Sequence, residues 1–263
     1  MNTQNMRRLS ITAFAGVVIV YLIIVQGAGL LLKPAGIGYG DLPDTDAILG
    51  TIVVPVTLSA LFAIAVVSYL RWWRPVLHDD KPVQPWVRIV PIVLALTILL
   101  TIDYDNLFDR SFGLVLWLLI GTLLVGFTEE LMFRGLGVMT FRRAGFTEGR
   151  VALWSSLVFG LVHATNIFTE GPKAFLQVIV VSFTGYFLYL SRRASGVIWV
   201  PMLLHGFYDF SVFSHLLGFD GELHAQGQAL IPLAANILLL IVVLPRLKKV
   251  DAPAGTAEPV ATG

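Results

Sequence analysis

The amino-acid sequence predicts an all-α fold, a polytopic bundle of about eight transmembrane helices. Of its 263 residues, 56% are hydrophobic and only 13% are charged, whereas soluble proteins carry about 25% charged residues. Several apolar runs reach the ~20 residues that a helix needs to cross a bilayer. These runs are continuously apolar rather than alternating, which argues against a transmembrane β-barrel. We therefore expect an integral, multi-pass protein surrounded by the lipid bilayer.

Eight apolar segments are candidate membrane spans. They cover approximately residues 10–32, 48–70, 87–102, 113–140, 151–168, 173–191, 196–217 and 228–245. The fifth and seventh are the least hydrophobic, and they contain His163 and His205. We expect residues 1–250 to form a single transmembrane domain with its catalytic half at about 110–217. The small, polar and Pro-containing segment 251–263 is predicted to be a disordered tail.

The loop charges predict the topology, because Lys and Arg concentrate on the cytoplasmic side of a membrane protein. With eight spans and a cytoplasmic N-terminus, the cytoplasmic segments hold Arg7, Arg8, Arg71, Arg74, Lys81, Arg88, Arg142, Arg143, Arg150, Arg192, Arg193, Arg246, Lys248 and Lys249. The opposite side holds only Lys33, Arg110 and Lys173, together with many acidic residues. Every loop agrees with this assignment, so both termini are predicted to be cytoplasmic.

Composition also excludes several classes of protein. The chain has no cysteine, which rules out disulfides, thiolate metal sites and cysteine nucleophiles. It has no basic block of the kind that binds nucleic acid. The charge pattern suits a bacterial plasma membrane, with an endomembrane as the alternative.

Ionisable side chains inside a span are costly, by roughly 2.5–3.5 kcal/mol at the centre of the bilayer, and they usually have a function. The spans contain a short set of them: Glu129, Glu130, Arg134, His163, His205 and Asp209. Glu129 lies 13 residues before Arg142, and His163 lies 13 residues after Arg150. His205 lies 12 residues after Arg193. At ~1.5 Å per residue, these three side chains reach the same depth on three helices.

Helical spacing divides the roles of these residues. Glu130 and Arg134 are four apart, so they share a helix face and can form an ion pair. Glu129 is rotated by about 100° from Glu130 and is left to face another helix. His205 and Asp209 are also four apart, so Asp209 can fix the tautomer of the imidazole.

A glutamate without a cationic partner, next to histidines in a partly dry cavity, can act as a general base toward water. The same groups could instead hold zinc through Glu129, His163 and His205, with one coordination position left for water. Both interpretations predict hydrolysis, either without a cofactor or with zinc.

The candidate spans contain three motifs: EExxxR at Glu129, Glu130 and Arg134, FxxxH at Phe159 and His163, and HxxxN/D at His205 and Asp209. In this order and on separate spans, they resemble the motifs of the CPBP family of intramembrane proteases. The family includes the CAAX prenyl endopeptidase of eukaryotes and bacterial Abi-type proteins. The resemblance covers roughly residues 110–215.

The resemblance implies a role for each matching position. Glu129 would activate the attacking water with help from His163, and Glu130 and Arg134 would form a structural pair. His205 and residue 209 would stabilise the oxyanion. An ionised Asp cannot donate a hydrogen bond, so Asp209 is expected to orient His205, support its positive charge or bind a metal. The family was first described as metalloproteases, and a metal-free glutamate mechanism is now favoured for it.

The sequence therefore predicts an intramembrane endopeptidase that acts on a peptide or protein substrate. Whether the substrate is prenylated or membrane-embedded stays open. The alternatives are a non-proteolytic scaffold, immunity or regulatory protein of the same fold, and a transporter or proton relay. The chain lacks the HExxH motif of zinc intramembrane proteases and a rhomboid-like serine motif, which excludes those two chemistries.

Overall fold

The computed structural model describes residues 6–38, 40–218 and 230–251. Within these residues the protein is all-helical, with three isolated β-bridges and no strand. The α-helices are α1 (Ile11–Leu32), α2 (Thr45–Ile48), α3 (Val54–Leu70), α4 (Trp73–Leu77), α5 (Ile89–Thr101), α6 (Tyr104–Phe108), α7 (Phe112–Glu130), α8 (Val138–Arg143), α9 (Glu148–Val162), α10 (Ile167–Glu170), α11 (Lys173–Ser195), α12 (Trp199–Phe213) and α13 (Leu230–Val243). The predicted all-α fold is confirmed.

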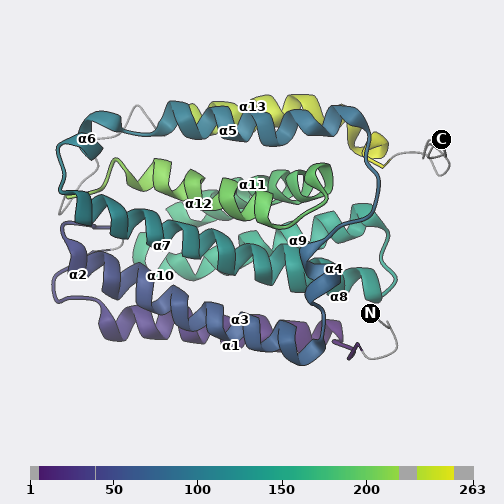
Figure 1. Cartoon of the computed structure of the whole chain (residues 1–263), viewed down its shortest axis with the longest axis horizontal. Helices are drawn as coiled ribbons and strands as arrows, with labels where there is room; N and C mark the ends of the chain where they lie inside the picture. The colour runs from purple at the N-terminus through teal and green to yellow at the C-terminus, as the bar shows by residue number, and fades with distance from the viewer. Residues whose placement is uncertain (1–5, 39, 219–229, 252–263) are drawn as a thin grey trace, which may run out of the picture.

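Short stretches of other helix types continue several of these helices. Two are π-helices, η2 (Leu49–Val53) and η4 (Leu131–Gly137), and three are 3-10 helices, η3 (Pro85–Arg88), η5 (His163–Asn166) and η6 (Leu244–Lys249). As a result, Phe112–Arg143 forms one continuous helical stretch of 32 residues. The long helices lie side by side along the long axis of the molecule (Figure 1).

Five helical stretches in the described part of the chain are long and apolar enough to cross a membrane. They are Ile11–Leu32, Thr45–Leu70, Phe112–Arg143, Lys173–Ser195 and Ile231–Lys249. Each of the eight predicted spans coincides with a helix, but Pro85–Thr101 is a shorter apolar helix and α9 and α12 have 15 residues each. An integral membrane protein is therefore indicated, and the count of eight spans stays a prediction.

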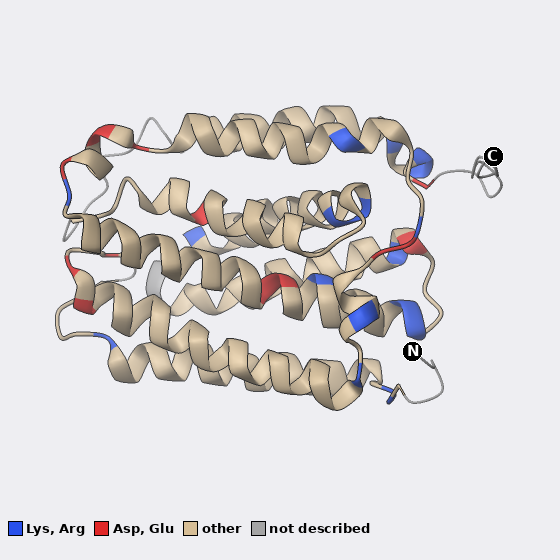
Figure 2. Ribbon diagram, viewed as in Figure 1, with Lys and Arg blue, Asp and Glu red and all other residues tan. Residues whose placement is uncertain are grey.

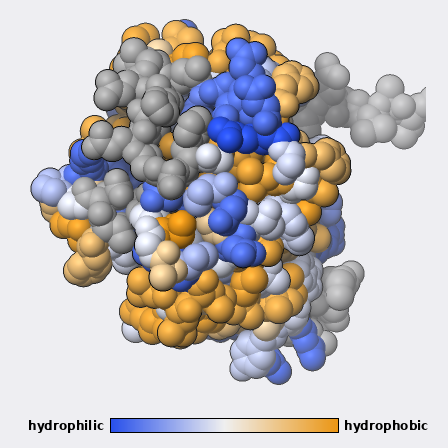
Figure 3. All heavy atoms as spheres, turned by 90° about the vertical axis from the view of Figure 1, so that its left-hand side faces the viewer, coloured by the Kyte–Doolittle hydropathy of each residue, from blue (hydrophilic) through white to orange (hydrophobic). Residues whose placement is uncertain are grey.

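The surface of the bundle is apolar, as expected of helices that face lipid. Leu31 on α1, Leu100 on α5 and Ile241 on α13 are among the large hydrophobic side chains that are well exposed. Figure 3 shows one end of the bundle, where hydrophilic residues gather on the end face and hydrophobic residues form much of the rim. In a bilayer, this rim would contact acyl chains and the end face would contact water.

Charged residues are separated between the two ends of the bundle. Most of the Lys and Arg lie at the end that carries α4, α8 and η6, and acidic residues mark the opposite end beside α2 and α6 (Figure 2). This separation agrees with the predicted topology. Which end faces the cytoplasm stays a prediction.

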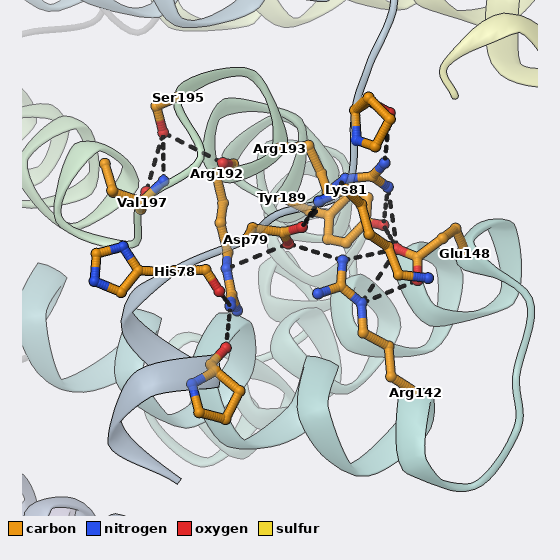
Figure 4. A network of polar contacts seen from close by, with 12 residues as sticks. His78, Asp79, Lys81, Arg142, Glu148, Tyr189, Arg192, Arg193, Ser195 and Val197 are labelled. Atoms are coloured by element: carbon orange, nitrogen blue, oxygen red, sulfur yellow. Dashed lines mark hydrogen bonds and ion pairs between the residues drawn. The ribbon is translucent and has the colours of Figure 1, made fainter. Parts of the chain in front are cut away.

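A buried network of charges holds the basic end together (Figure 4). The Oδ2 atom of Asp79 lies 2.8 Å from Nη2 of Arg142 and 3.6 Å from Nε of Arg192, and its Oδ1 atom lies 3.8 Å from Nε of Arg193. The Asp79 and Arg192 side chains are inaccessible to solvent. Asp79 therefore joins the loop after α4 to the ends of α8 and α11.

Glu148, the first residue of α9, is the second carboxylate of this network. It accepts hydrogen bonds from Arg142, Tyr189 and Arg193 and pairs with Lys81 at 2.8 Å. Although burial opposes its charge, the hydrogen bonds from Arg142, Lys81 and Tyr189 lower the pKa of Glu148 from 4.5 to about 2. The carboxylate therefore stays ionised and ties α9 to α8 and α11.

Residues 252–263, most of the predicted disordered tail, lie outside the described residues. Asp251, the first residue of that predicted tail, is held in place. Its carboxylate pairs with Nη2 of Arg193 at 2.7 Å, and its backbone forms a bridge with Val83.

Candidate active site

The candidate site begins where α7 changes into the π-helix η4. Glu129 and Glu130 are the last two residues of α7, and every residue of η4, Arg134 included, is buried. A π-turn inside a longer helix is rare and is frequently found at functional sites. Glu130 and Arg134 lie on either side of this change, four residues apart and therefore on the same helix face, which suits a pair between them.

Glu130 binds two cationic or donor groups through one oxygen. Its Oε1 atom accepts from Nη1 of Arg134 at 2.8 Å and from Nδ1 of His205 at 3.0 Å. The side chains of Glu130 and Arg134 are inaccessible to solvent. An ionised carboxylate is only an acceptor, so Nδ1 of His205 carries the hydrogen. Glu130 thus links the first and third sequence motifs.

The Arg134 guanidinium also packs on an aromatic ring. Its Cζ atom lies 4.0 Å from the centroid of Phe159, a geometry that favours a cation–π interaction. Gly185 on α11 makes room for both groups, because a Cβ there would lie 2.8 Å from Phe159 and 2.9 Å from Arg134. Any larger residue at 185 would displace the ring of Phe159, the arginine, or both.

Glu129 has a different environment from Glu130. Its Oε2 atom lies 3.8 Å from Nε2 of His205, and it is buried without a hydrogen-bond partner among the described residues. Its Oε1 atom accepts from the hydroxyl of Tyr21 at 3.5 Å. Arg134 pairs with Glu130 and not with Glu129. Glu129 therefore keeps an oxygen available for a small polar molecule.

His205 stands between three carboxylates. Its Nδ1 atom binds Glu130, while Nε2 faces Glu129 at 3.8 Å and Asp209 at 3.6 Å. The Asp209 side chain is 22% exposed and the Glu129 side chain 17%, so this side of the site is less enclosed than the Glu130 side. The four-residue spacing of His205 and Asp209 puts both on one face of α12, as predicted.

His163 lies at the point where α9 ends and the 3-10 turn η5 begins. Its Nδ1 atom donates to the carbonyl of Phe159 at 3.0 Å, which leaves Nε2 as an acceptor in the neutral tautomer. The ring of Phe159 contacts the rings of both His163 and His205, with centroids 5.3 and 5.6 Å apart. Within the described residues His163 forms no hydrogen bond or ion pair with Glu129, so it adjoins the other site residues through Phe159.

The predicted zinc ligand set is not assembled. The described ranges contain no group of three or more His, Cys, Asp or Glu side chains arranged to hold a metal ion. The alternative that required Glu129, His163 and His205 to converge on one ion therefore has no geometric support, and we derive no step through a metal.

Two glycines bring the helices of the site together. A Cβ on Gly126 of α7 would overlap the carbonyl of Met202 and the amide of Gly206, and a Cβ on Gly206 of α12 would meet the backbone of Thr122 and Leu123. Small residues let membrane helices approach closely. Glu129 and His205 lie within three residues of Gly126 and Gly206, so this crossing brings the two side chains to 3.8 Å from each other.

The sequence analysis missed Tyr21, Gly126, Gly185 and Gly206. A tyrosine within the first apolar span and a pair of glycines on two spans were available as signals. Their partners could not be read from the sequence, because Tyr21 and Glu129 are 108 residues apart.

Comparisons with known proteins agree with the resemblance that the motifs show. Residues 111–211 match the model of a family described as Rce1-like, the type II CAAX prenyl endopeptidases. The matched range contains all three motifs. This part of the chain is therefore similar to that family of proteases, as the motifs predicted. No curated protein and no solved structure gave a significant match.

Proposed function

We propose that this protein is an intramembrane endopeptidase in which Glu129 activates the water that attacks a peptide bond. One observation carries the proposal. The Glu129 carboxylate is largely buried, has no arginine partner among the described residues, and faces His205 at 3.8 Å. Its neighbour Glu130 carries the structural pairing instead. Two adjacent carboxylates thus have separate roles.

The first step forms the tetrahedral intermediate. Glu129 accepts a proton from water while the water oxygen forms a bond to the carbonyl carbon of the substrate, and the C=O electron pair moves onto oxygen. His163 is suited to orient this water, because its Nδ1 atom is held by the Phe159 carbonyl and its Nε2 atom is a free acceptor in the neutral tautomer.

The negative oxygen formed in this step needs a hydrogen-bond donor. Nε2 of His205 is the candidate, because Nδ1 is already used by Glu130 and Nε2 points toward the less enclosed side of the site. Asp209 would support the positive charge of His205 and would not donate. In the second step the C–N bond breaks, and Glu129 returns its proton to the leaving amine.

The substrate that fits this site is a peptide that reaches a site buried among membrane helices. A lipid-modified or membrane-embedded peptide would give up the least hydration when it enters such a site. We further propose a bacterial plasma membrane location with both termini in the cytoplasm, which rests on the distribution of Lys and Arg.

The test is cleavage of quenched peptides by the purified full-length protein in detergent. The panel pairs each prenylated peptide with its unmodified form. Glu129→Gln is compared with Asp46→Asn, a matched loss of one carboxylate on an exposed position of α2. We expect Glu129→Gln to lower kcat by at least about 100-fold, the usual scale of general-base catalysis, and Asp46→Asn to behave as wild type.

Full activity of Glu129→Gln would overturn the mechanism. Activity that is lost with a chelator and restored by zinc would mean that the same residues bind a metal ion. Absence of cleavage across the whole panel, with a folded wild type, would favour the non-proteolytic scaffold or regulatory function instead.

A further inference from the structure

The first helix contributes to the candidate site, although it lies outside the matched family region at 111–211. α1 runs beside α3 at one edge of the bundle (Figure 1). Only Phe14, Val18 and Tyr21 of this helix are buried, at spacings of four and three residues that form one face. Val20 and Ile23 on its other face are exposed. The buried face of α1 thus packs against the rest of the protein, and Tyr21 belongs to it.

Tyr21 is 2% exposed, and its ring packs edge-on against Phe133, with centroids 6.2 Å apart. A buried hydroxyl is costly unless it finds a hydrogen-bond partner. The hydrogen bond of this hydroxyl within the described residues goes to Oε1 of Glu129, at 3.5 Å. A phenylalanine at position 21 would pack equally well against Phe133. Packing therefore does not explain why this position carries a hydroxyl.

A second polar side chain of α1 contacts the other half of the site. Nε2 of Gln26 donates to Oγ1 of Thr165 at 3.1 Å. Thr165 lies in η5, two residues after His163. α1 therefore contacts both the carboxylate that would be the base and the turn that carries the histidine.

We propose that Tyr21 is a positioning residue for the hydrolysis, in which its hydroxyl donates to Oε1 of Glu129 and leaves Oε2 facing His205 and the water. The inference rests on the proposed function of Glu129. It extends that function to a residue of the first span, and it makes α1 part of the enzyme rather than only a membrane anchor.

The experiment compares Tyr21→Phe with Tyr104→Phe in the full-length protein. Both changes remove one phenol hydroxyl, and the Tyr104 hydroxyl donates to the carbonyl of Leu99 on an exposed surface. We expect Tyr21→Phe to lower kcat about tenfold, the loss of roughly one hydrogen bond to a charged group. KM and the melting temperature should stay close to wild type.

The pH profile separates positioning from packing. A donor to an ionised carboxylate favours the ionised form, so the acid limb of the pH–rate profile should move to higher pH in Tyr21→Phe. Tyr104→Phe should show neither change. A kcat and a pH profile equal to wild type in Tyr21→Phe would overturn the inference.

Glu129→Gln, measured in parallel, distinguishes this failure from failure of the proposed function. If Glu129→Gln is inactive and Tyr21→Phe is normal, only the role of Tyr21 is wrong. If Glu129→Gln is fully active, the proposed base is wrong and the inference falls with it.

Discussion

Nδ1 of His205 lies 3.0 Å from the Glu130 oxygen that also accepts from Arg134. One carboxylate oxygen therefore connects α7, η4 and α12. The same bond fixes the tautomer of His205 and directs its other nitrogen toward Glu129 and Asp209. Glu130 is thus more than the partner of Arg134, because it also orients the imidazole that faces the proposed base.

We predict that Glu130→Gln unfolds more easily than wild type and is inactive. The amide would leave the buried Arg134 guanidinium without a carboxylate, and breaking a buried ion pair from one side typically costs about 3–5 kcal/mol. Thermal unfolding in detergent measures the loss of stability, and peptide cleavage measures activity.

The adjacent residue serves as the control for this change. Glu129→Gln removes the same charge one position earlier and should unfold near the wild-type temperature. Adding Arg134→Met to Glu130→Gln should recover part of the stability, since no buried cation is then left unpaired. Equal melting temperatures for Glu130→Gln and Glu129→Gln would contradict this division of roles.

We predict that Gly126→Ala lowers both activity and stability. The added Cβ would overlap the backbone of α12 at Met202 and Gly206, and overpacking of this kind costs about 1–3 kcal/mol. The helices would have to separate, which moves Glu129 away from His205. Gly113→Ala on the same helix meets nothing within 4 Å and should leave both properties unchanged. Wild-type cleavage by Gly126→Ala would show that this crossing does not set the site geometry.

The sequence predicted those parts of the site that depend on local spacing. The four-residue intervals from Glu130 to Arg134 and from His205 to Asp209 follow from helical geometry alone, and both place the two side chains within 4 Å of each other. The tautomer of His205, which Asp209 was predicted to fix, is held by Glu130 instead. The apolar runs likewise predicted each long helix. These features need only the neighbours in the chain.

Features that depend on distant contacts could not be predicted. The π-helix at Leu131–Gly137 and the 3-10 turn at His163–Asn166 interrupt apolar segments that the sequence predicts to be continuous α-helices. The hydrogen bond from Tyr21 joins segments that are far apart in the chain. Helix type and helix contacts of this kind are decided by tertiary packing, which a single sequence does not display.

We predict that Glu148 stabilises the protein in a pH-dependent way. Its pKa is lowered from 4.5 to about 2 by its hydrogen bonds, despite burial. A group with a lowered pKa in the folded state stabilises the fold above its ordinary pKa, and this stabilisation is lost as the pH falls through the lowered value. The melting temperature of wild type should therefore fall as the pH drops from 4.5 toward 2.

Glu148→Gln should have a lower melting temperature at neutral pH and a flatter dependence on pH over the same interval. Asp80→Asn provides the control, because Asp80 lies in the same basic end but is exposed. A Glu148→Gln curve parallel to the wild-type curve would show that another carboxylate causes the acid sensitivity.

We predict that the short helix Pro85–Thr101 crosses the membrane. The chain has no cysteine, so single cysteines can be introduced without background labelling. Asp80 and Asp109 flank this helix and are both exposed. A membrane-impermeant maleimide should label Asp109→Cys in intact cells and Asp80→Cys only after permeabilisation. Labelling of both from the same side would mean that the helix does not cross.

The same labelling decides whether the helix that carries His163 crosses the membrane, because α9 is only 15 residues long. Arg150 and Lys173 lie on either side of the His163 turn, and both are exposed. Lys173→Cys should react in intact cells, and Arg150→Cys only after permeabilisation. Ser59→Cys, at a fully buried position of α3, should react only after denaturation. If Arg150→Cys and Lys173→Cys react from one side, His163 enters the membrane on a re-entrant segment. The prediction that residues 151–168 form a full span would then be wrong.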